Sequence, residues 1–172
     1  MAERRLFFAL WPSDRQRETL RDSLRPALIS VEGAPVDRRN WHVTLVFVGN
    51  FPEAQLPFLQ SAAAELDPGP IRLRFDRLAY LPRAKVACLL PMTAPPALLS
   101  LVGALEITLQ TFDRRADERT YRPHITVARR ARPFETMQLT RPIDLEWSGF
   151  TLVESKTLPT GAVYRPLAHY PV

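Results

Sequence analysis

Two short stretches of this sequence, "HVTL" and "HITV", each set a histidine two residues before a threonine. The first holds His42 and Thr44, and the second, 82 residues further along the chain, holds His124 and Thr126. Side chains of a strand alternate between its two faces, so each histidine shares a face with its threonine. The intervening positions then face the core. The sequence therefore predicts two strands that each present an imidazole and a hydroxyl together.

Paired imidazoles point to concerted acid-base chemistry. A neutral ring removes a proton from water or a hydroxyl, and a protonated ring supplies one to a leaving oxygen. Across a cleft, His42 and His124 could perform both steps on one substrate. The hydroxyls of Thr44 and Thr126 can donate to the oxygens of a phosphoryl group. Arg129, five residues after His124, is within reach of the same anion.

Other site chemistries fit less well. The third histidine, His169, has no threonine two residues on and is expected to be structural. The only cysteine, Cys88, lies in the apolar run "KVACLLPM" and is expected to fill the core. A zinc site would need further ligands, and neither a G-x-S-x-G motif nor a phosphate-binding glycine loop occurs. We therefore expect no metal and no cofactor.

The charge of the chain suits an anionic partner. It has 23 basic and 18 acidic residues, a net charge of +5, and all but two of the basic residues are arginines. Guanidinium groups grip phosphate oxygens as a planar fork, so RNA or a nucleotide is a reasonable ligand. A bias in base composition of the gene would also favour arginine over lysine. The charge alone therefore does not decide between these explanations.

Alternating patterns and caps predict the elements that position the two motifs. In the first half, we expect a strand at "RRLFFALWP", a helix opened by the capping box of Ser13 and Gln16, and a strand from Trp41 to Val48 closed by Gly49. Val43, Leu45 and Phe47 should anchor that strand from behind. A second helix is expected within "FPEAQLPFLQSAAAELDPG".

The second half repeats the order of the first. We expect strands at "IRLRFDRL" and "AKVACLL", a helix from Ala97 to Phe112, and a strand at "YRPHITVARR" that starts after Pro123. Two closing strands should meet at a turn from Pro159 to Gly161. Strand, helix, loop and histidine-bearing strand thus occur twice. This duplication predicts two lobes about a pseudo-twofold axis within a single bilobed domain, residues 1–172.

The paired motifs resemble those of the two-histidine (2H) phosphoesterase superfamily, and within it the LigT-like RNA 2′,3′-cyclic phosphodiesterases, also called 2′-5′ RNA ligases. The resemblance covers most of the chain, including "RLFFALWP", "WHVTLVFVGNFPE", "YRPHITVARR" and "LVESKTLPTGAVYRPLAHYPV". It implies an α+β, bilobed fold, with two lobes of antiparallel sheet, outer helices and a central cleft. It also implies that His42 and His124 are catalytic and that Thr44, Thr126 and Arg129 bind phosphate.

The resemblance further implies hydrolysis of a terminal 2′,3′-cyclic phosphate of RNA to a 2′-phosphomonoester, without metal or ATP, and reversible 2′-5′ joining of RNA ends. We expect His124 to activate water and His42 to protonate the departing 3′ oxygen, although these roles could be exchanged. Two alternatives remain open. One is a 2H phosphodiesterase for another small cyclic or 2′-5′ nucleotide, and the other is a non-catalytic RNA-binding module.

Cellular setting and assembly follow from composition. No apolar stretch is long enough for a membrane span, and the N-terminal apolar segment is too short for a signal peptide. We therefore expect a cytoplasmic monomer without membrane contact. Phe7, Phe8, Tyr80 and Tyr164 could stack on a base, but aromatic residues of strands are more often part of the core.

Overall fold

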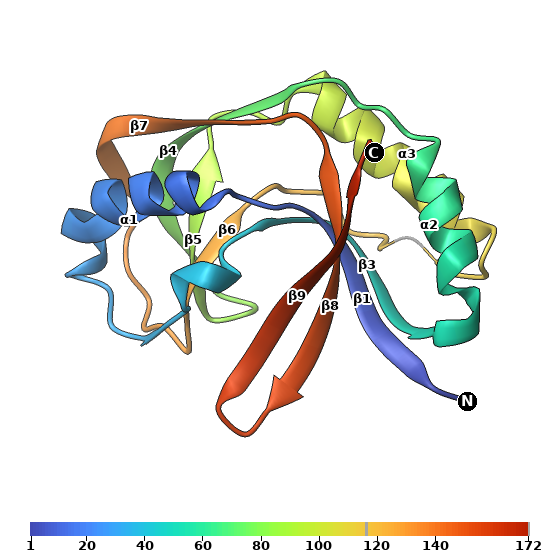
Figure 1. Cartoon of the computed structure of the whole chain (residues 1–172). Helices are drawn as coiled ribbons and strands as arrows, with labels where there is room; N and C mark the ends of the chain where they lie inside the picture. Colours follow the sequence, from blue (N-terminus) through green and yellow to red (C-terminus); the bar gives the residue numbers. More distant parts are fainter. Residues whose placement is uncertain (116, 172) are drawn as a thin grey trace.

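The computed structural model describes residues 1–115 and 117–171, which form an α+β fold around one antiparallel sheet (Figure 1). In chain order its elements are β1 (Glu3–Leu10), α1 (Asp14–Leu28), β2 (Ala34–Pro35), β3 (Val43–Pro52), α2 (Leu56–Ala64), β4 (Ile71–Leu81), β5 (Val86–Pro91), α3 (Pro96–Gln110), β6 (Ile125–Arg129), β7 (Met137–Trp147), β8 (Phe150–Leu158) and β9 (Gly161–Tyr170). Two 3₁₀ turns, η1 (Arg38–Asn40) and η2 (Glu53–Gln55), precede β3 and α2.

The sheet divides into two similar halves. Its strand order is β7-β4-β5-β6-β3-β1-β8-β9, and the short β2 pairs with β6. One lobe is β3-β1-β8-β9 and the other is β6-β5-β4-β7, so the unit β1-α1-β3 is answered by β5-α3-β6. Helix α1 lies against β7 of the second lobe, and α3 lies against β3 of the first (Figure 1). The predicted α+β fold with two related lobes and outer helices is confirmed.

Helix α1 begins as its capping pattern predicts. The Ser13 hydroxyl accepts the backbone N–H of Gln16, and the Gln16 side chain accepts the N–H of Ser13. Leu20 and Leu24 are fully buried on the face that packs on the sheet. The helix continues through Pro26 to Leu28, because a proline near a C-terminus removes only one of the last hydrogen bonds.

Strand β3 differs from its prediction. It runs to Pro52 rather than ending at Gly49, which adopts φ +81° at an irregularity of the pairing with β1. Leu45 has no partner in β1, since Thr44 pairs with Ala9 and Val46 with Phe8. This bulge reverses the alternation, so Val43 and Leu45 are buried while the side chain of Phe47 is 68% exposed. The prediction that Phe47 anchors the strand from behind was wrong.

The C-terminal region also differs, because it forms three strands where two were predicted. β7 and β8 are separated at Ser148 and Gly149, within the stretch that reads as one strand in the sequence. A Cβ atom at Gly149 would collide with the carbonyl oxygen of Tyr170, so β9 approaches this corner too closely for any side chain. The second helix, α2, ends at Ala64, earlier than predicted.

A continuous hydrophobic cluster joins the two lobes beneath the three helices. It includes Leu20 of α1, Leu59 of α2, Leu105 of α3, and strand residues of both lobes such as Phe8 and Phe75. The five apolar residues of α3 predicted from helical spacing, Leu98, Leu101, Val102, Leu105 and Leu109, are all buried. No helix within residues 1–115 and 117–171 is both long and apolar enough to cross a membrane.

Candidate active site

The two H-x-T motifs meet at the seam between the lobes. β3 and β6 are antiparallel and pair at Val43 and Ile125, both of which are fully buried. Continuing this register by one residue in each direction sets His42 opposite Thr126, and Thr44 opposite His124. The four polar side chains thus form a square on the face opposite the core. The pseudo-twofold axis passes through the Val43–Ile125 pair, and the two imidazoles occupy one diagonal.

This square is compact enough for one phosphate group. Directly opposed residues of an antiparallel pair have Cβ atoms about 5 Å apart, and diagonal neighbours lie about 7 to 8 Å apart. An anion above the Val43–Ile125 pair would therefore have an imidazole on either side and a hydroxyl on either side. The motifs, 82 residues apart in sequence, are brought together by the register that the duplication creates.

Each imidazole is oriented by a backbone carbonyl two residues earlier. Nδ1 of His42 lies 2.7 Å from the oxygen of Asn40, and Nδ1 of His124 lies 2.8 Å from the oxygen of Arg122. A carbonyl only accepts hydrogen bonds, so Nδ1 must carry the proton in both rings. In the neutral ring this leaves Nε2 as the basic nitrogen. Both histidines are thus oriented in the same way, by a carbonyl two residues earlier in the chain.

The threonines differ in their partners. Oγ1 of Thr44 lies 2.8 Å from Nε2 of His42, so its hydroxyl donates to the neutral ring. Oγ1 of Thr126 lies 3.6 Å from Sγ of Cys88. Cys88 is fully buried, as predicted, and burial raises the pKa of its thiol to about 11. This cysteine is therefore a protonated packing residue beneath Thr126.

Aromatic rings enclose His42. Its ring centroid lies 4.9 Å from that of Phe7, 5.7 Å from that of Trp11 in a stacked arrangement, and 5.3 Å from that of Tyr164 edge-on. Phe7 belongs to β1, Trp11 directly follows this strand, and Tyr164 belongs to β9, so two segments distant in sequence build this aromatic cage. Phe8, in contrast, is fully buried against Phe150 and cannot reach a ligand.

The aromatic cage changes the proton affinity of His42. Burial lowers its pKa from 6.5 to about 4, against the opposing effect of the Asn40 carbonyl. The positive charges of His124, Arg17 and Arg129 lower it further. In the free protein at neutral pH, His42 is therefore uncharged.

Arg17 is a functional candidate that sequence patterns did not reveal. Its side chain is buried, and it donates to the carbonyl oxygens of Pro12 at 2.6 Å and Trp41 at 3.1 Å. The guanidinium also lies 4.7 Å from the ring centroid of Trp11, a cation-π contact. It therefore holds both the residue before His42 and the ring stacked on His42. In the sequence, Arg17 looks like a solvated arginine of an amphipathic helix.

Arg129 lies at the end of β6, paired with Ala34 of β2. Its side chain is exposed, and its charge lowers the pKa values of both His42 and Cys88. Thr126 pairs with Cys88 and Ala128 with Ala87, so Val127 is an extra residue in β6 and Arg129 shares the face of Thr126. Arg129 is therefore a candidate for binding an anion above the Val43–Ile125 pair.

A cavity of about 600 Å³ opens onto Thr44 and His124 between the lobes. Its walls combine apolar side chains, including exposed Phe47, with arginines such as Arg122. Tyr121 donates its hydroxyl to the backbone oxygen of Thr44 at 2.9 Å, and burial raises the pKa of this phenol. The cavity has the size and the mixed lining of a small-ligand site.

His169 lies outside the square, on the same face of the sheet. It hydrogen-bonds through Nδ1 to Oγ1 of Thr151 at 3.1 Å. The histidine therefore has a threonine partner, but one from the neighbouring strand, which spacing along the chain could not reveal. Among the described residues, no three histidine, cysteine or carboxylate side chains gather closely enough to hold a metal ion.

Known proteins resemble this chain in sequence and fold. The family described as "LigT like Phosphoesterase" matches residues 10–88. An RNA 2′,3′-cyclic phosphodiesterase of Thermus thermophilus is 28% identical, with 96% of this chain and 89% of the relative covered. The structure of E. coli LigT complexed with 3′-AMP is 24% identical, with a TM-score of 0.87 and 98% of each chain covered. The structure of TT0787 of Thermus thermophilus is also 24% identical, with a TM-score of 0.78 and 96% of each chain covered. The predicted resemblance to the LigT-like phosphoesterases is confirmed.

Proposed function

Because the chain has the fold of the LigT-like phosphoesterases, we propose that it hydrolyses the 2′,3′-cyclic phosphate at the end of an RNA to a 2′-phosphomonoester. The observation that carries this proposal is the square of His42, Thr44, His124 and Thr126, with both rings held by Nδ1. The name of the Thermus relative supports the substrate class. The enzyme acts as a monomer, with residues 1–172 as a single bilobed domain in the cytoplasm.

The chemistry follows from the square. The cyclic phosphate lies above the Val43–Ile125 pair, where Thr44, Thr126 and Arg129 hold its non-bridging oxygens. One imidazole takes a proton from water as the new P–O bond forms, and the other gives a proton to the 3′ oxygen as its bond to phosphorus breaks. A 5′-hydroxyl of a second RNA in place of water would give a 2′-5′ linkage by the same steps.

Two role assignments fulfil this scheme. Water activation by His124 and proton donation by His42 require the bound phosphate anion to raise the pKa of His42 well above its value of about 4 in the free protein. The reverse assignment uses His42 in the neutral state that the aromatic cage already favours. Both histidines are required in either case.

The decisive assay uses RNA that ends in a 2′,3′-cyclic phosphate, with chelator present and the product monophosphate identified. We expect a 2′-phosphate, undiminished turnover in chelator, and a loss of several orders of magnitude in His42→Ala and His124→Ala, both with wild-type circular dichroism. Full activity in either variant would overturn the two-histidine mechanism. Faster turnover of a small cyclic or 2′-5′ nucleotide than of RNA would move the substrate to that class.

A substrate with sulfur at the 3′ position separates the two assignments. A thiolate leaves without protonation, because its conjugate acid is far stronger than an alcohol. The variant that lacks the general acid should recover much of its rate on this substrate. The variant that lacks the general base should remain inactive on both substrates.

A further inference from the structure

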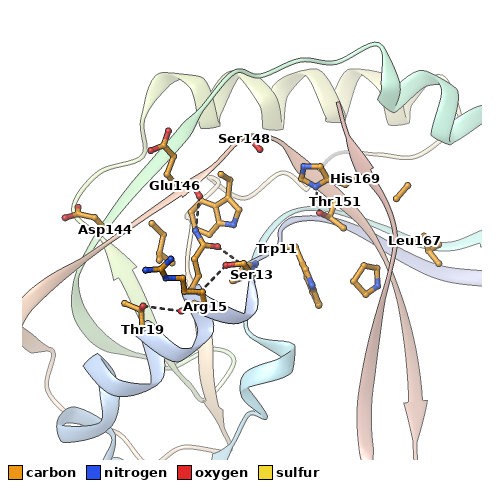
Figure 2. Close-up of a pocket in the computed structure, with 16 residues that line it drawn as sticks. Trp11, Ser13, Arg15, Thr19, Asp144, Glu146, Ser148, Thr151, Leu167 and His169 are labelled. Atoms are coloured by element: carbon orange, nitrogen blue, oxygen red, sulfur yellow. Dashed lines mark hydrogen bonds between the residues drawn. The ribbon is translucent and has the colours of Figure 1, made fainter. Parts of the chain in front are cut away.

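Figure 2 shows a second groove, of about 740 Å³, lined by residues of both lobes. One wall is the start of α1, and the opposite wall is the hairpin of β8 and β9, which carries Thr151 and His169. The end of β7, including Ser148, closes the groove between them. The fold leaves this space because β7 and β8 diverge at the corner of Ser148 and Gly149.

The groove is continuous with the catalytic face. Trp11 projects between α1 and the β8–β9 hairpin, where it lines the groove, and its ring also stacks on His42 (Figure 2). The pairing of strands gives a second connection, since Thr44, Ala9, Thr151 and His169 form one row across four neighbouring strands. Residues in register share a face, so the row runs from the square into the groove over about 14 Å.

The walls of the groove offer unused hydrogen-bonding groups. His169 uses Nδ1 for Thr151, which leaves its second ring nitrogen available, and the hydroxyl of Ser148 is exposed.

The charge of the groove is compatible with a nucleotide. Two carboxylates lie at its edge, but Asp144 is paired with Arg74 at 3.3 Å and Glu146 with Arg72 at 3.2 Å. Arg15, on the α1 side, forms no ion pair with any described residue. One free guanidinium and an apolar surface around Trp11 suit a heterocyclic base with a linking phosphate.

We propose that this groove binds the nucleotide that precedes the cyclic phosphate-bearing residue, so that the preferred substrate is an oligoribonucleotide rather than a free cyclic mononucleotide. This inference rests on the proposed function of the square. The base packs on the apolar wall beside Trp11 and forms hydrogen bonds along its edge to Ser148 and His169. The added contact raises the turnover of longer substrates without touching the reacting atoms.

The test compares kcat/KM for adenosine 2′,3′-cyclic phosphate and for the dinucleotide ApA that ends in a 2′,3′-cyclic phosphate. Wild-type protein should prefer the dinucleotide by at least about tenfold, the gain expected of one stacked base. Ser148→Trp fills the groove and His169→Ala removes a hydrogen-bonding group. Ser148→Trp should bring the ratio of the two kcat/KM values close to one, and His169→Ala should lower it about threefold or more, both through a loss on the dinucleotide.

The matched control variant carries its added tryptophan on α3 instead of in the groove. Ser100→Trp adds the same bulk on the exposed side of α3, away from both sites, and should leave the ratio as in wild type. A wild-type ratio near one, or a preference that survives both groove variants, would overturn the subsite but leave the proposed function intact. No turnover of either substrate by wild-type protein would overturn both. Thermal unfolding of each variant checks that the fold is preserved.

Discussion

At the scale of single residues, the environment of His42 sets how the protein responds to acid. Its pKa is 6.5 in an unfolded chain and about 4 in the fold, so the unfolded state binds more protons between these values. Stability is therefore complete above pH 6.5 and is lost as pH falls toward 4. The ordinary histidine pattern, in which a partner raises the pKa, would have the opposite sign.

This difference can be measured by denaturant unfolding. Between pH 7 and pH 5, wild-type protein should lose about 2 kcal/mol more unfolding free energy than His42→Gln, which has no titrating ring at this position. Identical pH dependence in the two proteins would mean that the aromatic cage does not exclude the charged ring.

Arg17 is the second residue with a role distinct from simple packing. Arg17→Met keeps the length of the side chain but leaves the carbonyl oxygens of Pro12 and Trp41 without their donor. We expect a loss of about 2 to 4 kcal/mol in unfolding free energy. Because the charge of Arg17 also lowers the pKa of His42, the limb of the pH–rate profile that reports His42 should move to higher pH.

Arg17→Lys is the matched control for this variant. It retains the charge and part of the hydrogen bonding, so its pH–rate profile should stay close to that of wild type. Its unfolding free energy should lie between those of wild type and Arg17→Met. A profile that shifts equally in both variants would show that Arg17 acts through shape alone.

At the scale of elements, two glycines should respond in opposite ways to alanine. Gly149 stands at the corner between β7 and β8, where a Cβ would collide with the carbonyl of Tyr170. Gly103 lies inside α3, where a Cβ meets no atom within 4 Å. Gly149→Ala should lower the unfolding free energy by about 1 to 3 kcal/mol, whereas Gly103→Ala should raise it by about 0.5 to 1 kcal/mol. Thermal melts of both proteins check the contrast.

Local patterns in the sequence were sufficient to predict most helices and strands, because helix caps and the alternation of apolar residues are local properties. The capping box of Ser13, the buried stripe of α3 and the shared face of His42 and Thr44 all follow from spacing. Contacts between distant segments were not accessible in this way. The aromatic cage draws on β1 and β9, and the Thr151–His169 hydrogen bond joins two strands.

The exceptions within strands also have long-range causes. The bulge at Leu45 depends on how β1 pairs with β3, so alternation along β3 alone put Phe47 on the wrong face. The break at Ser148 depends on the approach of β9 to Gly149. The two motifs were found from sequence because each spans only three residues at the start of one strand, whereas their surroundings come from several elements.

At the scale of the whole molecule, the shared core predicts how the chain unfolds. The main hydrophobic cluster takes residues from both lobes and from all three helices, so neither lobe can lose its packing alone. Thermal unfolding should therefore be a single transition, with equal calorimetric and van't Hoff enthalpies, at a mass of 19.6 kDa by light scattering. Two resolved transitions would contradict the proposed single domain, and a doubled mass the proposed monomer.

The pseudo-twofold square has a stereochemical consequence. The two imidazoles stand at opposite ends of one diagonal, so under the proposed mechanism the water enters from one end as the 3′ oxygen departs toward the other. Such an in-line path inverts the configuration at phosphorus. In this mechanism, the two non-bridging oxygens face Thr44 and Thr126, which the pseudo-twofold axis relates to each other. The neighbours of these threonines differ, since Thr44 contacts an imidazole and Thr126 contacts a thiol. The protein would thus distinguish the two diastereomers of a cyclic phosphorothioate through the few side chains in which the two lobes differ.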